Sequence, residues 1–430
     1  MSVFFFGVNV IMKAWLILAD GTIFEGTSIG KTGRTTGETV FTTGMTGYLE
    51  TLTDPSYFGQ IVTQTFPLIG NYGVIPEDFE SKKPWVRGYI VRELCDEPSN
   101  FRCGGKLDDF LKKHGIVGIC GIDTRALTKK LRESGVMNGM IVSGDEADKM
   151  VRHAELVSAS ILDEIKSYQI VDAVKSVQGG AITPVLNTKR PASSVIPVLD
   201  TGISGSDGKP CNGSAYHVVL FDFGAKANIQ RELEKRGCKV TVVPYNTKAE
   251  EVAALSPDGL MLSNGPGDPA ENVGVIEGIR KLCEWNKETL KQVQGDSASH
   301  AELVSASHAI PIFGICLGHQ MLALARGAKT SKLKYGHRGG NHPVKDLETG
   351  RVYITSQNHG YAVQTDEGSL PPCAKLSFVN LNDGTCEGIT YTDIPAFSVQ
   401  FHPEACGGPH DTNFLFDKFM AMMEASHAAK

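Results

Sequence analysis

The sequence lacks several features that would assign it to common classes of protein. Its ten cysteines are scattered without a C-x-x-C pair, which disfavours a disulfide framework or a zinc finger and suits a reducing compartment. Acidic residues outnumber basic ones by 48 to 42, so there is no basic surplus for nucleic acid or an anionic membrane. No apolar run is long enough to span a bilayer. We therefore predict a cytoplasmic protein with no nucleic-acid or membrane partner.

A phosphate-binding loop is also missing. Gly26–Thr32 superficially matches G-x-x-x-x-G-K-T, but its glycines are one residue too close together and no periodic helix follows. We therefore reject this stretch as a nucleotide site. The sequence predicts no cofactor in this chain.

The 430 residues are enough for two or three domains. Residues 1–11 are apolar, and we interpret them as a dispensable extension because Met12 opens a cleaner strand pattern. Residues 12–175 alternate short strands with glycine turns and predict a mixed α/β domain. Residues 176–215 are rich in Ser, Gly, Pro and Thr without periodicity, which predicts a linker. In residues 216–430 strands alternate with helices, so we predict a doubly wound α/β fold with a mostly parallel sheet and its ligand site at the carboxyl ends of the strands.

An eight-residue repeat interrupts this second domain. His153–Ser160 recurs as His300–Ser307, and two copies are too few for a solenoid. The second copy lengthens the connection between a predicted helix and the strand that starts at Ile310. We interpret the stretch at about residues 290–308 as a surface insertion.

The stretch Pro311–Gln320 carries the strongest chemical signal. An apolar β-branched run predicts a strand, and the residues after Cys316 predict a helix. Gly314 and Gly318 lie two residues on either side of Cys316, which is the spacing of a nucleophile elbow. Small neighbours are needed there because strand and helix approach closely, and a helix N-terminus favours thiolates. Alone, however, the motif does not distinguish a nucleophile from a buried structural cysteine.

A second stretch supplies candidate partners for this cysteine. An apolar strand predicted from Ala396 leads to His402 and then Glu404, with Pro403 fixing the bend between them. A nucleophile, a base and a carboxylate that orients the base are the three parts of a catalytic triad. His359 is a rival base, but no carboxylate lies near it in the sequence. We therefore predict that His402 is the base and Glu404 its orienting group.

A glycine loop completes the pattern. Upstream of the elbow, a predicted strand runs into Gly265 and Gly267, whose N–H groups would form half of an oxyanion hole, with the N–H of Leu317 as the other half. The glycine loop, the elbow and the His-Pro-Glu segment, in this order, resemble the class I (triad) glutamine amidotransferases. The resemblance implies that Cys316 attacks the side-chain amide of glutamine and that His402 passes a proton to the leaving ammonia. Water then releases glutamate from a glutamyl thioester.

The first domain makes the resemblance more specific. The segments T-G-Y, D-P-S-Y, I-G-N-Y-G, S-N-F-R and G-I-D-T-R follow one another between Thr46 and Arg125. They resemble the N-terminal domain of the small (glutamine-hydrolysing) chain of carbamoyl-phosphate synthase, and the likeness covers nearly the whole chain from Met12. It implies that Ser56 reaches across to the bound glutamine. From the residues alone, the preferred interpretation of Ser56 is a hydroxyl that caps a turn.

Matching motif to motif extends the predicted glutamine site. Gln320, one turn after the nucleophile, would hold polar groups of the substrate. Asn358, Gly360 and Tyr361 would contact its amino-acid end.

A metal site is the alternative for the histidines near the elbow. His319 lies three residues after Cys316, and His337 and His342 follow. Cys316 and His319 mimic a C-x-x-H metal half-site, with His337 and His342 as the possible remaining ligands, but no further geometry supports a metal and the triad needs the thiolate. We therefore predict no metal.

The resemblance also implies a partner. A chain of this family hydrolyses glutamine and passes ammonia, within a heterodimer, to a larger subunit that uses ATP and Mg to make carbamoyl phosphate for arginine and pyrimidine synthesis. Two rival interpretations stay open: a free-standing glutamine or γ-glutamyl hydrolase, and a catalytically silent regulatory chain. The first domain weakens the former, and the presence of Cys316, His402 and Glu404 weakens the latter.

Overall fold

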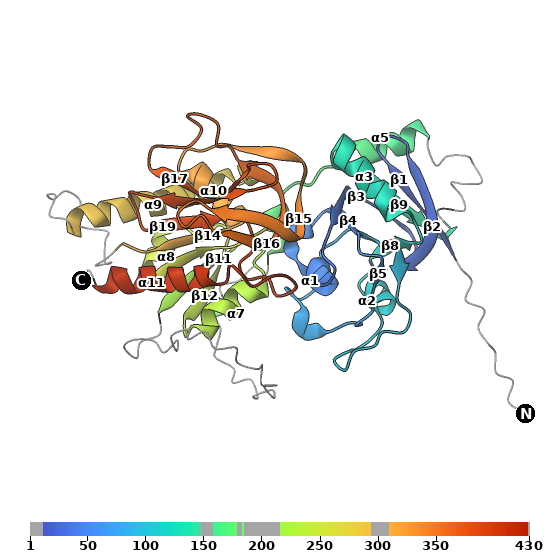
Figure 1. Cartoon of the computed structure of the whole chain (residues 1–430), viewed down its shortest axis with the longest axis horizontal. Coiled ribbons are helices and arrows are strands. Elements are labelled where there is room, and N and C mark those ends of the chain that lie inside the picture. Colours follow the sequence, from blue (N-terminus) through green and yellow to red (C-terminus); the bar gives the residue numbers. More distant parts are fainter. Residues whose placement is uncertain are drawn as a thin grey trace, which may run out of the picture.

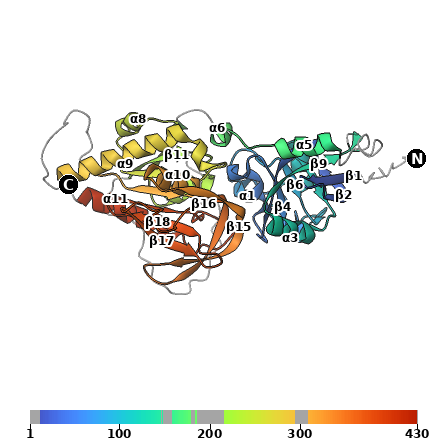
Figure 2. The same ribbon diagram turned by 90° about the horizontal axis from the view of Figure 1, so that it is seen from above.

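The computed structural model describes most of both predicted domains, namely residues 12–145, 147, 158–178, 183–184, 216–293 and 309–428. Several predicted segments lie wholly or largely outside these described residues: the extension 1–11, most of the linker 176–215, positions 294–308 of the insertion and the second copy of the repeat. Figures 1 and 2 show two lobes that meet near α1 (Tyr48–Thr53) and β15 (Thr330–Asp346).

The first lobe is built on a closed barrel. Its strands, in barrel order, are β1 (Lys13–Leu18), β2 (Ile23–Gly30), β8 (Val117–Cys120), β6 (Gly88–Ile90), β4 (Gln60–Gln64), β3 (Arg34–Thr42) and β9 (Met137–Ser143). Strand β9 closes the barrel by pairing with both β1 and β3. The sequence predicted short strands here but not their closure, because closure depends on pairs as distant in the chain as Arg34 and Val142.

Short helices surround the barrel, and one of them, α1, lies next to the second lobe (Figure 1). They are α1, η1 (Pro55–Tyr57), η2 (Pro76–Asp78), α2 (Leu107–Lys113), α3 (Thr124–Ser134), α5 (Ala159–Ser167) and α6 (Ala173–Val177), and a small parallel pair joins β5 (Leu68–Ile69) to β7 (Glu93–Leu94). Local chemistry fixes their ends. Asp123 caps α3 by accepting from the N–H of Ala126, and Asp54 caps η1 in the same way.

The second lobe contains one long mixed sheet. Its strands, in spatial order, are β10 (Thr183–Pro184), β12 (Lys239–Pro244), β11 (His217–Asp222), β13 (Gly259–Leu262), β14 (Ile312–Ile315), β19 (Ala396–Val399), β18 (Cys386–Tyr391), β17 (Ala374–Asn380), β15 and β16 (Val352–Val363). The run from β12 to β19 is parallel. The predicted doubly wound sheet is therefore confirmed, and β10, which falls in the predicted linker, pairs with its edge.

Helices pack on both faces of the parallel strands. One face is covered by α8 (Ala249–Ala254), α9 (Val273–Val293) and α10 (Leu317–Ala325), whose apolar side chains join one core cluster. The other is covered by α7 (Ala227–Lys235) and α11 (Phe414–Ala428) (Figure 2). At the antiparallel end of the sheet, β15 and β16 lie next to the first lobe (Figure 1). The residues that follow β13 and β14 line a cavity together with Ser56 of the first lobe, so the carboxyl ends of these strands lie where the two lobes meet.

Among the residues that the structure describes, no helix combines the length and the apolar character needed to cross a membrane.

Candidate active site

Cys316 occupies a strained position between β14 and α10. Its backbone has φ 52° and ψ −104°, a conformation that costs a non-glycine residue of the order of 1–3 kcal/mol and clusters at functional sites. Tight packing explains the flanking glycines. A Cβ on Gly318 would lie 2.2 Å from the carbonyl oxygen of Leu262, and one on Gly314 would lie 2.9 Å from that of Gly318. The strand, turn and helix predicted here are present, and the turn projects Cys316 from the strand end.

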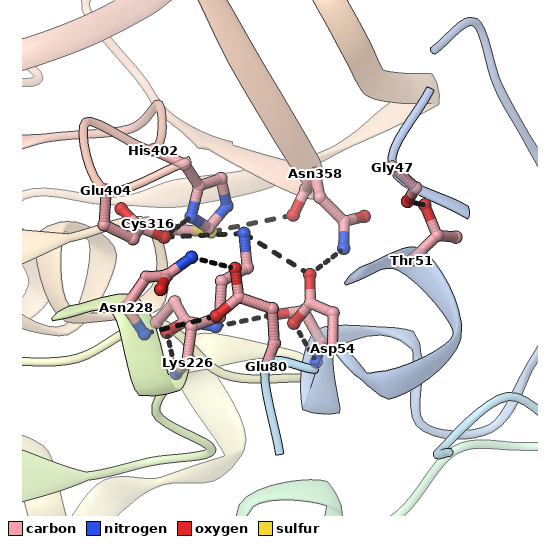
Figure 3. Close-up of polar contacts among 12 residues, drawn as sticks. Gly47, Thr51, Asp54, Glu80, Lys226, Asn228, Cys316, Asn358, His402 and Glu404 are labelled. Carbon is pink, nitrogen blue, oxygen red and sulfur yellow. Dashed lines mark hydrogen bonds and ion pairs between the residues drawn. The ribbon is translucent and has the colours of Figure 1, made fainter. Parts of the chain in front are cut away.

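His402 and Glu404 reach the same point from the segment after β19. Nδ1 of His402 lies 2.7 Å from Oε1 of Glu404, and the imidazole ring lies against the sulfur of Cys316 (Figure 3). Its other nitrogen, Nε2, is buried and has no hydrogen-bond partner within the described structure. All three side chains are at most 2% exposed. The carboxylate thus orients one nitrogen and leaves the other available beside the sulfur.

The surroundings set the protonation of this pair. Two effects lower the pKa of His402: burial, which is the largest single effect, and the charge on Lys226. Glu404 and Cys316 together outweigh these effects and raise the pKa to about 10. Burial raises the pKa of Glu404, yet His402 and Lys226 together bring it down to about 2. At neutral pH the imidazole is therefore protonated and the carboxylate ionised. A protonated base beside the sulfur can donate its proton to a leaving group.

A cavity of about 340 Å³ opens over Cys316 between the two lobes. All but one of the predicted glutamine contacts line it: Ser56, Gly265, Gly267, Gln320, Asn358, Gly360 and Tyr361. The exception is Leu317, whose side chain belongs to the core and packs against Gly265. Only the backbone N–H of Leu317, at the first position of α10, is placed to serve the site.

Hydrogen bonds hold several of these cavity residues in place. The amide nitrogen of Gln320 donates to the carbonyl of Tyr361 at 2.7 Å and to Gln400 Oε1 at 2.9 Å, so its oxygen is the end left for a ligand. The thiol of Cys316 lies 3.6 Å from the carbonyl oxygen of Asn358. The bonds to Tyr361 and Gln400 fix the orientation of the Gln320 side chain in the cavity wall.

The rival base, His359, has both ring nitrogens occupied. Nδ1 lies 2.7 Å from the carbonyl oxygen of Tyr361, and Nε2 lies 2.8 Å from Gln357 Oε1. Burial, reinforced by the charge on His337, lowers the pKa of His359 well below its usual value. His359 therefore has no free nitrogen with which to act as a base, and its position is that of a residue in the cavity wall.

Of the histidines considered for a metal site, His337 and His342 lie together, with ring centroids 5.1 Å apart, while His319 has a different partner. Nδ1 of His319 lies 2.8 Å from Ser398 Oγ, and burial lowers the pKa of His319 to about 3. Among the described residues, His337, His359 and Glu387 could hold a metal ion, because their ligand atoms lie within 4.8 Å of one another. Hydrogen bonds already occupy both ring nitrogens of His337 and of His359, so an ion would have to displace them.

Sequence reasoning missed a buried ion network beside the triad. Nζ of Lys226 lies 3.4 Å from Glu404 Oε1 and 3.6 Å from Asp54 Oδ2 (Figure 3). Burial lowers the pKa of Lys226, but Asp54, Glu404 and Glu80 outweigh it and raise the pKa above its ordinary value. One signal could have identified Lys226: it follows β11 at the carboxyl edge of the parallel sheet, where ligand sites gather.

A further missed residue, Glu80, joins the same network from the first lobe. Its carboxylate accepts from the N–H of Asn228 at 3.2 Å and from Asn228 Nδ2 at 2.9 Å. Burial raises the pKa of Glu80 to about 7, and Glu404 and Asp54 add to that rise while Lys226 opposes it. Charged groups of both lobes therefore meet beside the triad.

A buried cysteine at a strand-to-helix elbow, with a histidine and a carboxylate at the carboxyl edge of a doubly wound sheet, defines a class I glutamine amidotransferase. Consistent with this class, residues 219–422 match the family described as glutamine amidotransferase class-I. Residues 16–141 match the family described as carbamoyl-phosphate synthase small chain, CPSase domain.

Curated relatives match this chain over nearly its full length. The carbamoyl phosphate synthase small chain of Bacillus cereus is 49% identical over 413 residues, with 96% of each chain covered. Those of Listeria monocytogenes and Symbiobacterium thermophilum are 48% and 46% identical; the matches cover 96% and 95% of this chain and 97% and 98% of the relatives. The chain belongs to the carbamoyl phosphate synthase small chain family.

Proposed function

We propose that this chain is the glutaminase subunit of a glutamine-dependent carbamoyl phosphate synthase, with Cys316 as nucleophile, His402 as acid and base, and Glu404 as the group that orients His402. One observation carries the assignment. The free nitrogen of His402 is buried beside the sulfur of Cys316, and Cys316 lines a cavity formed by both lobes.

The first half-reaction forms a thioester. The Cys316 sulfur adds to the amide carbon of glutamine, and the amide oxygen gains the negative charge. Backbone N–H groups of Leu317 and of the Gly265 to Gly267 loop stabilise that oxyanion. Protonated His402 gives its proton to the amide nitrogen, the C–N bond breaks, and ammonia leaves.

The second half-reaction releases glutamate. His402, now neutral, takes a proton from water, and the resulting hydroxide adds to the thioester carbon. The C–S bond then breaks and restores the Cys316 thiolate beside protonated His402. The new γ-carboxyl group loses its proton to solvent, and glutamate departs. Glu404 stabilises the imidazolium in both steps, because it lies 2.7 Å from Nδ1.

The cavity residues select glutamine. The oxygen of Gln320 and the groups of Asn358, Gly360 and Tyr361 accept and donate hydrogen bonds to the polar ends of the substrate, and Ser56 does so from the first lobe. All of them line the cavity that contains Cys316. A site built from polar groups of this kind rejects analogues that lack the matching partner.

Ammonia from this site serves a larger partner subunit that binds ATP and Mg. Activation of bicarbonate and carbamate requires phosphoryl transfer, and this sequence contains no phosphate-binding loop. The first lobe supplies docking surface, which is supported by two apolar side chains: Met45 is 69% exposed and Phe101 is 90% exposed. The product feeds arginine and pyrimidine synthesis, and the chain itself carries no cofactor.

The hydrolytic role is tested with the purified chain and L-glutamine. We expect glutamate to form and expect Cys316→Ser to abolish its formation without unfolding the chain, because a serine hydroxyl is far less acidic than a thiol. Acid quenching during turnover should trap glutamine-derived mass on the peptide that contains Cys316. Substantial activity in Cys316→Ser would reject the assignment.

The partnership is tested separately. A chain that begins at Tyr216 should fail to co-purify with the large subunit, whereas the full chain should bind it. The large subunit alone should make carbamoyl phosphate from ammonia, and should use glutamine once this chain is added. ATP turnover by this chain alone would contradict the division of labour, and efficient hydrolysis of γ-glutamyl peptides would favour a free-standing hydrolase.

A further inference from the structure

The turn that joins α1 to η1 carries a carboxylate from the first lobe into the site of the second. Asp54 in this turn is 3% exposed. Its Oδ1 accepts from the N–H of Ser56 at 2.9 Å. Its Oδ2 accepts from Asn358 Nδ2 at 3.0 Å and lies 3.6 Å from Lys226 Nζ (Figure 3). One side chain therefore contacts groups of both lobes.

A second set of bonds closes a circuit across the lobe boundary. Asn264 Nδ2 donates to Ser56 Oγ at 2.9 Å, and the N–H of Lys226 donates to Asn264 Oδ1 at 3.0 Å. Since Lys226 Nζ pairs with Asp54, the path runs from Asp54 through Ser56, Asn264 and Lys226 back to Asp54. Moving any of these groups breaks a buried hydrogen bond, which is costly.

Two of the neighbours connect Asp54 to the reacting groups. The carbonyl oxygen of Asn358 lies 3.6 Å from the Cys316 sulfur, and Lys226 lies 3.4 Å from Glu404. Lys226 is thus held between a carboxylate of each lobe. Without the charge on Asp54, the ammonium would pair more fully with Glu404, and Glu404 would stabilise a protonated His402 less.

We propose that Asp54 is a positioning residue for glutamine hydrolysis: it fixes Ser56 and Asn358 against the substrate and holds Lys226 so that Glu404 stays committed to His402. This inference rests on the proposed function. It makes the first lobe a part of the hydrolytic site and not only a docking surface. The competing role is purely structural, in which Asp54 caps η1 and stabilises the contact between lobes.

The positioning role and the purely structural role of Asp54 predict different pH dependences, because charged groups of both lobes surround Asp54. The titratable groups around it are Tyr57 and Glu80 from the first lobe and Lys226, Glu404 and His402 from the second. Asp54→Asn removes one negative charge from this set, so the pKa of His402 should fall. The alkaline limb of glutaminase activity should then move to lower pH, which a loss of capping alone would not cause.

The experiment compares Asp54→Asn with Asp78→Asn in the full chain, measuring kcat, KM, their pH dependence and the melting temperature. Asp78 is the matched control because it is a first-lobe carboxylate that pairs with Arg102 at 3.2 Å, near the surface. For Asp54→Asn we expect kcat/KM to fall about 100-fold, from misplaced contacts, with a higher KM, a lower kcat and a shifted alkaline limb. Asp78→Asn should match the parent in all of these.

A double-mutant cycle with Asn358→Ala sharpens the result. Because Asp54 acts through Asn358, the combined loss should be smaller than the product of the separate losses. Independent losses together with an unshifted pH profile would overturn the proposal. If Asp54→Asn does not fold, Asp54→Glu serves instead: it keeps the charge, so it should raise KM and leave the alkaline limb in place, and a shifted limb would count against us.

The two proposals fail in different ways. A parent chain that releases no glutamate from glutamine rejects the proposed function. A fully active parent with an equally active Asp54→Asn rejects only the positioning role.

Discussion

Two buried histidines of the second lobe each pair with a carboxylate, yet their surroundings give them different roles. His402 uses Nδ1 to bind Glu404 and keeps Nε2 free beside Cys316. His337 uses Nε2 to bind Asp383 at 2.8 Å, and its Nδ1 lies 3.1 Å from Gln357 Oε1. A histidine–carboxylate pair is therefore not itself a catalytic device. What distinguishes His402, the proposed base, is an unoccupied nitrogen beside the proposed nucleophile, Cys316.

The two histidines do not differ in their protonation state at neutral pH. Burial lowers the pKa of His337, but its hydrogen bonds to Asp383 and Glu387 outweigh burial and raise the pKa to about 9. His402 reaches about 10 by the same balance. Both rings are thus protonated at neutral pH. A perturbed pKa marks candidate sites, but here geometry decides which of them can react.

The largest expected effect separates the histidines directly. His402→Asn should lower kcat by about 10³-fold or more, because it removes the proton donor and acceptor, while the melting temperature stays close to the parent's. His337→Asn should instead cost about 2–4 kcal/mol of stability, because it leaves the buried carboxylate of Glu387 without its charged partner, and should retain most of kcat. Saturation kinetics and denaturant unfolding of both variants check this. If both variants fold and lose kcat to the same extent, the proposed difference in role between His402 and His337 is wrong.

A smaller effect on activity should follow from the carboxylate of the catalytic pair. Glu404→Ala should be roughly 100-fold less damaging to kcat than His402→Asn, since orienting the base matters less than having it. Because Glu404 raises the pKa of His402, its removal should lower that pKa and move the alkaline limb of the pH profile toward neutrality. Kinetics across the pH range measure both changes. Were Glu404→Ala the more damaging variant, the roles assigned here would have to be exchanged.

The smallest effect concerns the stability of the second pair. Asp383→Asn should lower the free energy of unfolding by about 1 kcal/mol, a modest value because Asp383 is partly exposed to solvent. Its pKa is held below the usual range, so its contribution is present above the ordinary carboxyl pKa and is lost in acid. The raised pKa of His337 adds stability that is complete below about pH 6.5 and disappears as pH rises through about 9.

The stability difference should therefore be greatest between about pH 4 and pH 6.5 and fade above about pH 9. Unfolding titrations at several pH values measure it, with Asp366→Asn, at an exposed turn, as the matched control. A difference that does not vary with pH would show that the pair contributes no charge interaction.

Sequence reasoning succeeded where chemistry is local in the chain. The elbow around Cys316 needs glycines at fixed offsets for steric reasons, and His402 and Glu404 are separated by a single proline, so their spacing carries the geometry. It failed for Asp54 and Lys226, because charged residues are normally exposed and nothing local shows that two such distant groups meet in the interior.

The antiparallel half of the sheet escaped prediction for a related reason. Strand β16 carries Ser356, Gln357, Asn358 and His359 in succession. Gln357 bonds to His359, and Asn358 and His359 line the cavity, so the strand does not alternate between apolar and polar as a half-buried strand usually does. Barrel closure was equally invisible, since it depends on long-range pairing between β9 and both β1 and β3.

The order of the strands along the chain has a consequence for biosynthesis. The barrel closes only when β9, ending at Ser143, has been made, and β14 gains its neighbour β19 only after Val399. Long-range pairing of this kind forms late, and His402 and Glu404 come later still. A chain still on the ribosome therefore holds a finished first lobe but no base for Cys316. The proposed base is thus added to the site only after both the first lobe and the strand that leads to Cys316 have been synthesised.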